Sequence, residues 1–172
     1  WQVSVTESVA PVIVTISDSK SGEIPHGGVT VDTRVIITGT ASKGQKVEVF
    51  DGITSQGQAS ANPVSGVFTL EISELSPTVH SFSLKGLYGA APVTGERTLT
   101  VVTPVVPVIT LLIDRHGIEV ADGDTIVNTW IDLVGTGSAG LEVEIFVGLV
   151  SMGKVAVNAR GGWEYRVSGL QS

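Results

Sequence analysis

The sequence contains no cysteine, a single methionine and few charged or aromatic residues. Without cysteine the chain can form no disulfide scaffold, thiolate metal site or cysteine nucleophile. Only 10 of its 172 residues are Lys or Arg, against 17 Asp or Glu, and the formal net charge is -7. This balance argues against a nucleic-acid partner, because binding to phosphates needs clustered positive charge. Disorder driven by charge and low hydrophobicity is excluded as well, since only 16% of the residues are charged and 42% are hydrophobic.

The sequence also lacks an apolar run long enough to span a membrane. Its longest uncharged, mostly apolar stretch is residues 98–113, which is short for a membrane helix and contains Pro104 and Pro107. We therefore predict two strands joined by a proline-containing connection, and no membrane insertion by this segment. The sequence begins at Trp1 and has no signal-peptide pattern, so we expect it to be part of a longer protein.

The residues that are abundant are those that favour strands and turns. There are 28 valines, 17 threonines and 21 glycines. Side chains branched at Cβ pack well on a pleated surface, and glycine suits the turns between short strands. The composition therefore predicts an all-β protein.

An internal repeat organises the sequence. Residues 11–62 align without a gap with residues 107–158, an offset of 96, and 19 of the 52 paired positions are identical. After a deletion of one residue, residues 68–70 align with residues 163–165. The chain therefore contains two copies of one module.

The two copies are not equally complete. Residues 79–87 and 96–102 of the first copy have no counterpart in the second, whereas residues 2–5 align with residues 98–101. We therefore divide the chain into the last strand of a preceding repeat with its linker, a complete domain, a proline-containing linker, and a second domain that lacks its last two strands. These segments are residues 1–10, 11–103, 104–107 and 108–172.

Alternating apolar and polar residues predict about seven short strands in the complete module, separated by turn residues. This number and spacing are typical of an immunoglobulin-like sandwich with antiparallel sheets and Greek-key connections. A polar loop is expected over residues 18–28. By strict alternation, Phe50 and Phe146 fall on the polar face, so we expect the strand to bend or end there. The strands are predicted at residues 12–17, 33–40, 46–50, 58–61, 68–72, 79–87 and 96–102.

Spaced motifs occur at residues 11–13, 18–28, 38–41, 47–52 and 161–165. They resemble the bacterial Ig-like repeats of large exported, adhesin-type surface proteins. The resemblance implies tandem Ig-like domains in a structural spacer or stalk, or sometimes a tip module, and no catalytic activity. It also implies an extracellular or cell-surface location, with adjacent repeats of the same polypeptide as partners. In many relatives the turn before the last strand is acidic, whereas residues 87–92 here are not.

A second hypothesis belongs to a different class of function. Loops or exposed edge strands of the modules could bind a glycan or a protein on a host or biofilm surface, with calcium ordering the loops. The stiff, proline-containing connection favours the spacer, because its backbone is held extended.

Candidate metal ligands are the carboxylates that recur five residues apart in the first loop of each copy. Calcium takes six to eight oxygen ligands, and Asp122 and Asp124 add to the second copy. Solvated loop charges and turn formation are the alternative interpretation, since no EF-hand or other known calcium-loop pattern is present. The calcium candidates are Asp18, Glu23, Asp114 and Glu119.

The remaining candidates are histidines and tryptophans. His26 and His116 are expected to be solvated in loops, and His80 to lie near the start of a strand. No histidine spacing typical of zinc sites is present. Trp163 aligns with Phe68 on an inward face, which predicts a core position. Trp130 aligns with Arg34 at the start of a strand and is expected to be an exposed contact residue.

The incomplete second module suggests one further hypothesis. Without its last two strands it would expose a sheet edge and part of its core. Residues 1–5 of another copy could dock there, because they align with one of the missing strands.

Overall fold

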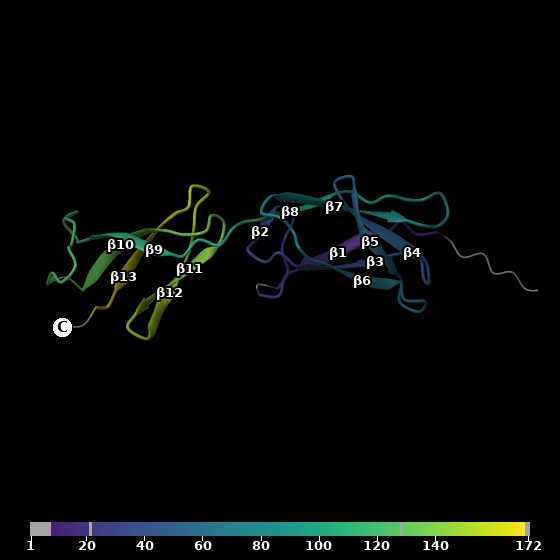
Figure 1. Ribbon diagram of the computed structural model, residues 1–172. Helices are drawn as coiled ribbons and strands as arrows, with labels where there is room; N and C mark the ends of the chain where they lie inside the picture. The colour runs from purple at the N-terminus through teal and green to yellow at the C-terminus, as the bar shows by residue number, and fades with distance from the viewer. Residues whose placement is uncertain (1–7, 21, 128, 171–172) are drawn as a thin grey trace, which may run out of the picture. The chain divides into compact units, whose positions relative to one another are not determined.

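The computed structural model describes residues 8–20, 22–127 and 129–170 of the chain (Figure 1). It contains thirteen strands and no helix among these residues. The chain forms two compact units that divide between Val102 and Thr103, here called unit 1 and unit 2. Both are β-sandwich structures of the Ig-like class, as the composition and periodicity predicted.

Unit 1 contains eight strands in two sheets. One sheet has the order β1-β3-β6 and the other the order β2-β8-β7-β4-β5. The strands are β1 (Val12–Ser17), β2 (Gly28–Thr30), β3 (Val35–Thr40), β4 (Lys46–Asp51), β5 (Thr54–Ser60), β6 (Val67–Ile72), β7 (Val79–Gly86) and β8 (Arg97–Val101).

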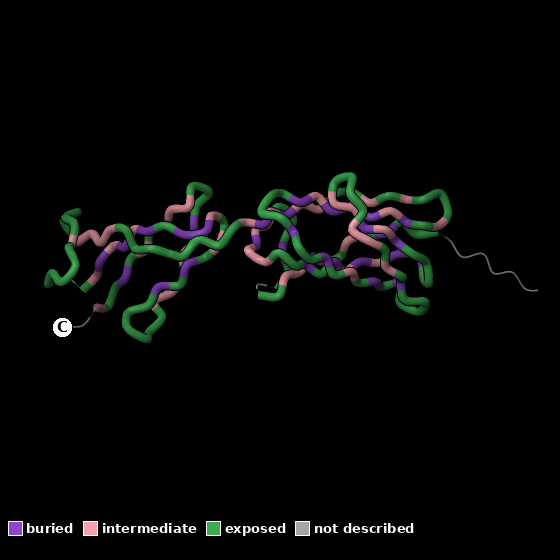
Figure 2. Tube along the Cα trace, in the orientation of Figure 1, coloured by how far each residue is buried: buried purple, intermediate pink, exposed green. Residues whose placement is uncertain are grey.

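The core of unit 1 lies between the two sheets, where alternate side chains of each strand point inward. Figure 2 shows this alternation as buried and exposed positions that follow one another along the strands. β7 is a clear example, since four of its eight residues are buried and each is preceded by one that is exposed or partly exposed. The fully buried apolar side chains include Ile16, Val35, Ile37, Val47, Val49, Phe82, Leu84, Leu99 and Val101.

Unit 2 repeats the first part of this arrangement. One sheet has the order β13-β10-β9, and β11 and β12 form the other. The buried core is smaller and includes Ile131, Leu133, Val143, Ile145, Trp163 and Val167. The strands are β9 (Val108–Ile113), β10 (Trp130–Thr136), β11 (Glu142–Val147), β12 (Val150–Ala156) and β13 (Gly162–Ser168).

Two strands of unit 1 differ from the sequence prediction. β2 was not predicted: it begins at Gly28, the last residue of the predicted loop, and ends at Thr30. It pairs with β8 in parallel, so the sandwich is not wholly antiparallel. A strand of three residues is too short to show a periodic pattern, and its pairing depends on a distant strand. β5 begins at Thr54, four residues earlier than predicted. Its polar residues lack alternation, and they form a strand because β4 pairs along their whole length.

A close contact between a glycine and an aromatic ring recurs in both units. A Cβ on Gly39 would lie 2.5 Å from Phe68, and a Cβ on Gly135 would overlap the ring of Trp163. Both rings are buried, as predicted for Trp163 from its alignment. Glycine at these two positions lets the ring lie directly on the backbone of the neighbouring strand.

The strands that contain Phe50 and Phe146 end one residue after the ring, β4 at Asp51 and β11 at Val147. A β-bulge is present beside each ring, but its extra residue lies in the partner strand, Gln56 in β5 and Met152 in β12. The strands therefore end close to the expected place, and β4 itself pairs with β7 without a register shift. Phe50 is partly buried, whereas Phe146 is 55% exposed.

The apolar run at residues 98–113 forms two strands with an irregular connection between them. It contains most of β8 and all of β9, which confirms the predicted strand, connection and strand. Among the described residues no helix has the length and apolar character needed to cross a membrane.

Candidate functional site

The segment that leads into each unit is held by a serine hydroxyl. In unit 1 the backbone N–H of Val9 donates to the Ser42 hydroxyl over 2.8 Å. In unit 2 the N–H of Val105 donates to the Ser138 hydroxyl over the same distance. Each hydroxyl lies within hydrogen-bond distance of the carbonyl of the same valine, at 3.3 and 3.4 Å. The two pairs are 96 residues apart, so both modules hold their leading segment in the same way.

Unit 1 adds a tyrosine to this anchor. The Tyr88 hydroxyl donates to the carbonyl of Val9 over 2.7 Å and accepts from the backbone N–H of Ser42 at 3.3 Å. Tyr88 lies in the connection between β7 and β8. This connection therefore contributes an aromatic side chain that joins the last part of the module to the segment preceding its first strand.

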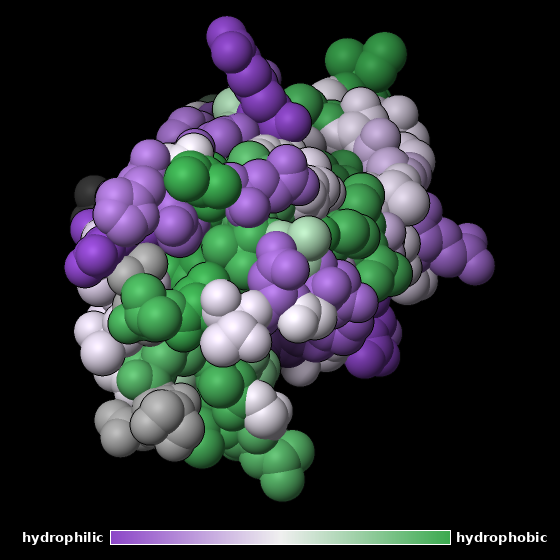
Figure 3. All heavy atoms as spheres, turned by 90° about the vertical axis from the view of Figure 1, so that its left-hand side faces the viewer, coloured by the Kyte–Doolittle hydropathy of each residue, from purple (hydrophilic) through white to green (hydrophobic). Residues whose placement is uncertain are grey.

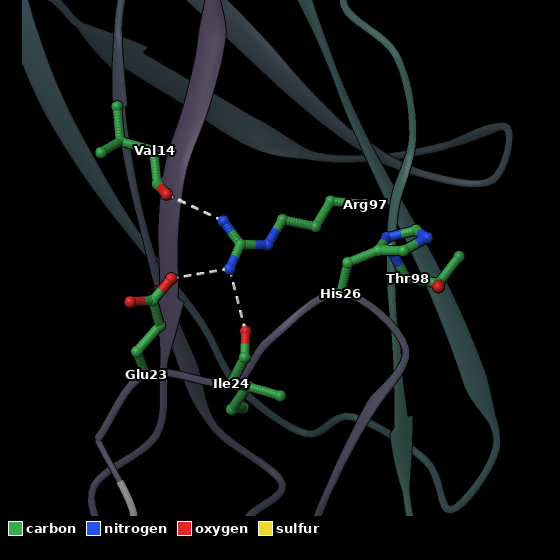
Figure 4. A network of polar contacts seen from close by, with 6 residues as sticks. All are labelled: Val14, Glu23, Ile24, His26, Arg97 and Thr98. Atoms are coloured by element: carbon green, nitrogen blue, oxygen red, sulfur yellow. Dashed lines mark hydrogen bonds and ion pairs between the residues drawn. The ribbon is translucent and has the colours of Figure 1, made fainter.

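Arg97 joins the two sheets of unit 1 at the other end of β1 (Figure 4). Its guanidinium donates to the carbonyl of Val14 at 2.8 Å, to the carbonyl of Ile24 at 3.0 Å and to the Glu23 carboxylate at 2.9 Å. The side chain of Arg97 is only 17% exposed. A hydrogen bond between charged partners is stronger than a neutral one, and here it connects β8 to β1 and to the first loop.

His26 lies beside this cluster and is exposed, as predicted. Its Nδ1 accepts a hydrogen bond of 3.2 Å from the backbone N–H of Thr98. An open groove of about 470 Å³ is lined by Glu23, His26 and Arg97, among other residues. Because Arg97 is already bonded to three oxygens of the protein, this groove does not present a free guanidinium to a ligand.

The buried His80 and the partly exposed Asp51 form a pair that the sequence interpretation did not identify. His80 is the second residue of β7 and is 5% exposed. Its Nδ1 lies 2.6 Å from the Asp51 carboxylate and its Nε2 lies 2.9 Å from the carbonyl of Ser76. The same carboxylate accepts from the backbone N–H of Ser81 at 2.9 Å. Alternation indicated that His80 shares a face with Phe82, but its partner follows from the pairing of β4 with β7.

The carboxylates of the first loop of unit 1 are engaged in local hydrogen bonds. Asp18 accepts from the Thr30 hydroxyl at 2.6 Å and from the backbone N–H of Lys20 at 3.0 Å. Glu23 instead points to Arg97. The Ser19 hydroxyl and N–H both donate to Asp32, which lowers the pKa of that carboxyl. Asp18 and Glu23 therefore have different partners within the loop.

The equivalent loop of unit 2 is a turn ordered by Asp114. This side chain accepts from the backbone N–H groups of Ile118 at 2.9 Å and His116 at 2.8 Å. Several hydrogen bonds lower the pKa of the Asp114 carboxyl, and the bond from the Ile118 N–H has the largest effect. Glu119 is exposed and pairs through its backbone with Ile113. The side chain of Asp114 is thus occupied in forming a turn.

Among residues 8–20, 22–127 and 129–170, no group of three or more His, Asp or Glu side chains is placed to hold one metal ion. Asp122 and Asp124 are exposed in a turn closed by Asp124, which accepts from the N–H of Ala121 at 3.0 Å. Calcium binding by Asp18, Glu23, Asp114 and Glu119 stays a prediction.

Trp130 lies at the start of β10 and is partly exposed rather than fully exposed. The guanidinium of Arg166 lies 4.0 Å from the centre of its ring, in a cation–π contact. Arg166 also donates two hydrogen bonds to Asp132, at 2.6 and 2.7 Å. These bonds lower the pKa of the Asp132 carboxyl and raise that of Arg166. One face of the indole is therefore covered by a residue of the adjacent strand.

The chemistry that these groups support is structural. The serine anchors, the Arg97 cluster and the Trp130 cluster each join strands or connecting segments of one unit. Apart from the buried Nε of Arg97, which has no hydrogen-bond partner among the described residues, the side-chain donors of these groups are directed at protein atoms. The geometry of each favours a fixed backbone over the binding of a small molecule.

Comparison with known proteins supports the fold at low sequence identity. No known protein family and no curated protein matches the sequence. A solved structure of the fibronectin(III)-like modules of Clostridium thermocellum CbhA matches with a TM-score of 0.50 and 14% identity. It covers 91% of this chain and 80% of that one. At this identity the similarity shows the fold, a β-sandwich of the Ig-like class.

A second solved structure, described as the BSP domain of a biofilm associated protein, has 16% identity. It covers 88% of this chain but 25% of that one, with a TM-score of 0.29. A similarity at this TM-score supports no conclusion about fold or function.

Proposed function

We propose that this chain is a non-catalytic structural spacer from the stalk of a repetitive bacterial adhesin, at the cell surface or secreted. The observation that carries the proposal is the serine anchor that recurs in both units. In each one, Ser42 or Ser138 binds the backbone of the segment that leads into the module. A spacer needs this property, because its length is useful only if the connections between modules are held.

The connection between the units leaves few backbone torsions free. The N–H of Val102 donates to the carbonyl of Thr30 in unit 1 at 2.9 Å. The N–H of Val105 is already bonded to Ser138 in unit 2. Only Thr103 and Pro104 lie between these two anchored residues, and the ring of Pro104 restricts its φ. The spacer proposal therefore expects hinge motion to be limited to the torsions of these two residues.

The same proposal assigns the partners and the location. The partners are adjacent Ig-like repeats of the same polypeptide, as the resemblance to bacterial Ig-like repeats implies. An exported location is supported by that resemblance and by the absence of cysteine, which frees the fold from any dependence on redox state. Antibodies against this chain should label intact cells of the bacterium that encodes it, and labelling only after permeabilisation would contradict surface display.

The spacer role can be tested by the spread of distances between the units. The chain has no cysteine, so Ile53→Cys and Leu149→Cys introduce two unique sites for spin labels at positions that are 98% and 99% exposed. We expect a narrow distance distribution by double electron–electron resonance. Pro104→Gly combined with Ser138→Ala should broaden it, because this pair of changes frees the connection.

Two comparisons make the result decisive. Ser151→Ala removes an exposed serine that bonds to Glu144 within unit 2, and should leave the distribution unchanged. A chain with six Gly and Ser residues inserted after Thr103 defines a fully flexible connection. If the unaltered chain gives a distribution as broad as this insertion, the spacer proposal is wrong.

A further inference from the structure

Unit 2 presents an open apolar face. An open cavity of about 460 Å³ lies on it, lined by Ile109, Leu112, Leu133 and Phe146, among other residues. Ile109 is 51% exposed and the neighbouring Val147 is 44% exposed. Figure 3 shows hydrophobic side chains that run in a band across the side of the molecule that lies on the left in Figure 1. Contiguous exposed apolar surface of this kind marks an interaction site.

In unit 1 the same face is covered by β7 and β8. Ile16 and Ile37 occupy the positions 96 residues before Leu112 and Leu133, and both are at most 1% exposed. The side chains that cover this face of unit 1 come from the two strands, and each is at most 2% exposed. They are Phe82, Leu84, Leu99 and Val101.

The backbone of unit 2 offers the matching edge. In unit 1, β4 is hydrogen-bonded on both sides, to β5 and to β7. In unit 2, β11 pairs with β12 alone among the strands that the structure describes. The other edge of β11 therefore presents N–H and C=O groups to which an added strand can bind.

The pairing in unit 1 specifies the register of such a strand. There, Val49 lies opposite Leu84 and Asp51 lies opposite Phe82. An offset of 96 converts these positions into Ile145 and Val147 of β11. An antiparallel strand in this register would place a leucine opposite Ile145 and an aromatic residue opposite Val147, with both side chains over the cavity.

A carboxylate on unit 2 lies where a second added strand, the equivalent of β8, would bring an arginine. In unit 1, Arg97 at the start of β8 pairs with Glu23. The position 96 residues after Glu23 is Glu119, which is exposed and makes no ion pair with any residue that the structure describes. An arginine on a docked return strand would therefore meet a carboxylate at the equivalent place.

We propose that the open face of unit 2 binds a β-hairpin with the pattern of β7 and β8, supplied by a polypeptide of the same repeat type. The first strand adds to β11 in the register given above, and the second brings an arginine to Glu119. This inference does not depend on the spacer role. Residues 1–5 of a second copy fit less well, because they supply one strand and have Trp1 where the hairpin has Arg97.

The test uses the intact chain and a fluorescent peptide with the sequence of residues 78–102. We expect saturable binding, followed by fluorescence anisotropy, and protection of the β11 amides from hydrogen exchange. Phe82→Asp in the peptide should weaken binding by at least about a hundredfold, because it places a charge in the apolar cavity. Ser83→Asp, at the next position and on the opposite face of the strand, is the matched control and should have a much smaller effect.

The arginine contact has its own test. Arg97→Met in the peptide and Glu119→Gln in the chain should each weaken binding, by about three- to tenfold. The two changes together should weaken it no more than the stronger single change, because they remove one shared interaction. Independent effects that multiply would overturn the proposed contact with Glu119.

A covalent version keeps the proposal testable if the peptide is insoluble. Residues 78–102 appended after Ser172 continue the alignment of the repeat, in which Ser172 corresponds to Pro77. We expect the appended chain to protect β11 from exchange and to unfold at a higher temperature, and Phe82→Asp in the appended segment to abolish both effects. No gain in protection or stability would overturn the proposal. Self-association of the unmodified chain, if Val3→Asp abolished it, would also overturn the proposal. Residues 1–5 of a second copy would then occupy the open face.

Discussion

The Ser138 hydroxyl accepts a hydrogen bond of 2.8 Å from the backbone N–H of Val105, 33 residues earlier in the chain. Ser42 and Val9 have the same separation in sequence and the same distance in space. Ser138 is 9% exposed, so water competes weakly for its hydroxyl. The segment leading into each module is therefore part of that module, and the first prediction concerns this bond.

Ser138→Ala should lower the free energy of unfolding of unit 2 by about 1–2 kcal/mol, because the N–H of Val105 loses its partner. Differential scanning calorimetry of the whole chain measures this as a lower transition temperature. Ser151→Ala, which removes an exposed hydroxyl bonded to Glu144, should change stability by less than about 0.5 kcal/mol. Equal losses for the two variants would show that Ser138 is not an anchor.

Gly39→Ala should destabilise unit 1 by about 2–3 kcal/mol, because the new methyl group would lie 2.5 Å from both the Phe68 ring and the carbonyl oxygen of Val12. Urea denaturation followed by circular dichroism gives the free energy. The matched control is Gly95→Ala, where no atom lies within 4 Å of the added methyl group, and it should be close to neutral. A neutral Gly39→Ala variant would contradict the close packing of ring on backbone.

Arg97→Met should destabilise unit 1 by about 1–3 kcal/mol, since the carbonyls of Val14 and Ile24 would lose a donor. The control is Arg34→Met. Arg34 pairs with Glu71 at 3.7 Å with both side chains about half exposed, so the loss should stay below about 0.5 kcal/mol. Thermal unfolding at neutral pH compares the two variants, and a similar loss for both would contradict the role of Arg97 in joining the sheets.

The pair formed by Asp132 and Arg166 should make the stability of unit 2 dependent on pH. Its hydrogen bonds lower the pKa of Asp132 in the folded state. The stabilisation is therefore complete above the unfolded pKa of about 3.9, and is lost as the pH falls through the lower native pKa. Asp132→Asn should lose this part of the acid dependence, measured by thermal melts as the pH is lowered below about 4. An unchanged acid profile would contradict the coupling.

Most of the fold was predictable because it follows from short-range periodicity. The alternation of Phe82 and Leu84 located β7, and the repeat transferred the strands of one module to the other. Trp163 was placed in the core by its alignment with Phe68, without any knowledge of its neighbours. The end of β4 next to Phe50 was predicted because this apolar residue falls on the polar face of its own strand.

The candidate sites were harder to predict. The partner of Asp51 is a histidine 29 residues away, and the partner of Arg97 is a carbonyl 83 residues away. Nothing in the neighbouring sequence indicates either partner, because both contacts depend on which strands become neighbours in the fold. Trp130 was expected to be exposed, but the register of β10 against β13 places Asp132 opposite Arg166, whose guanidinium covers the ring.

The sequence by itself determined that this protein is all-β and that it consists of two copies of one module at an offset of 96. Residue type and periodicity act over a few positions, and a repeat can be read directly from the letters. Only the tertiary structure decided that β2 pairs in parallel with β8, that Ser138 holds Val105, and that one face of unit 2 is open. These relationships arise when two sheets pack and bring distant segments together, and a linear pattern carries no record of that packing.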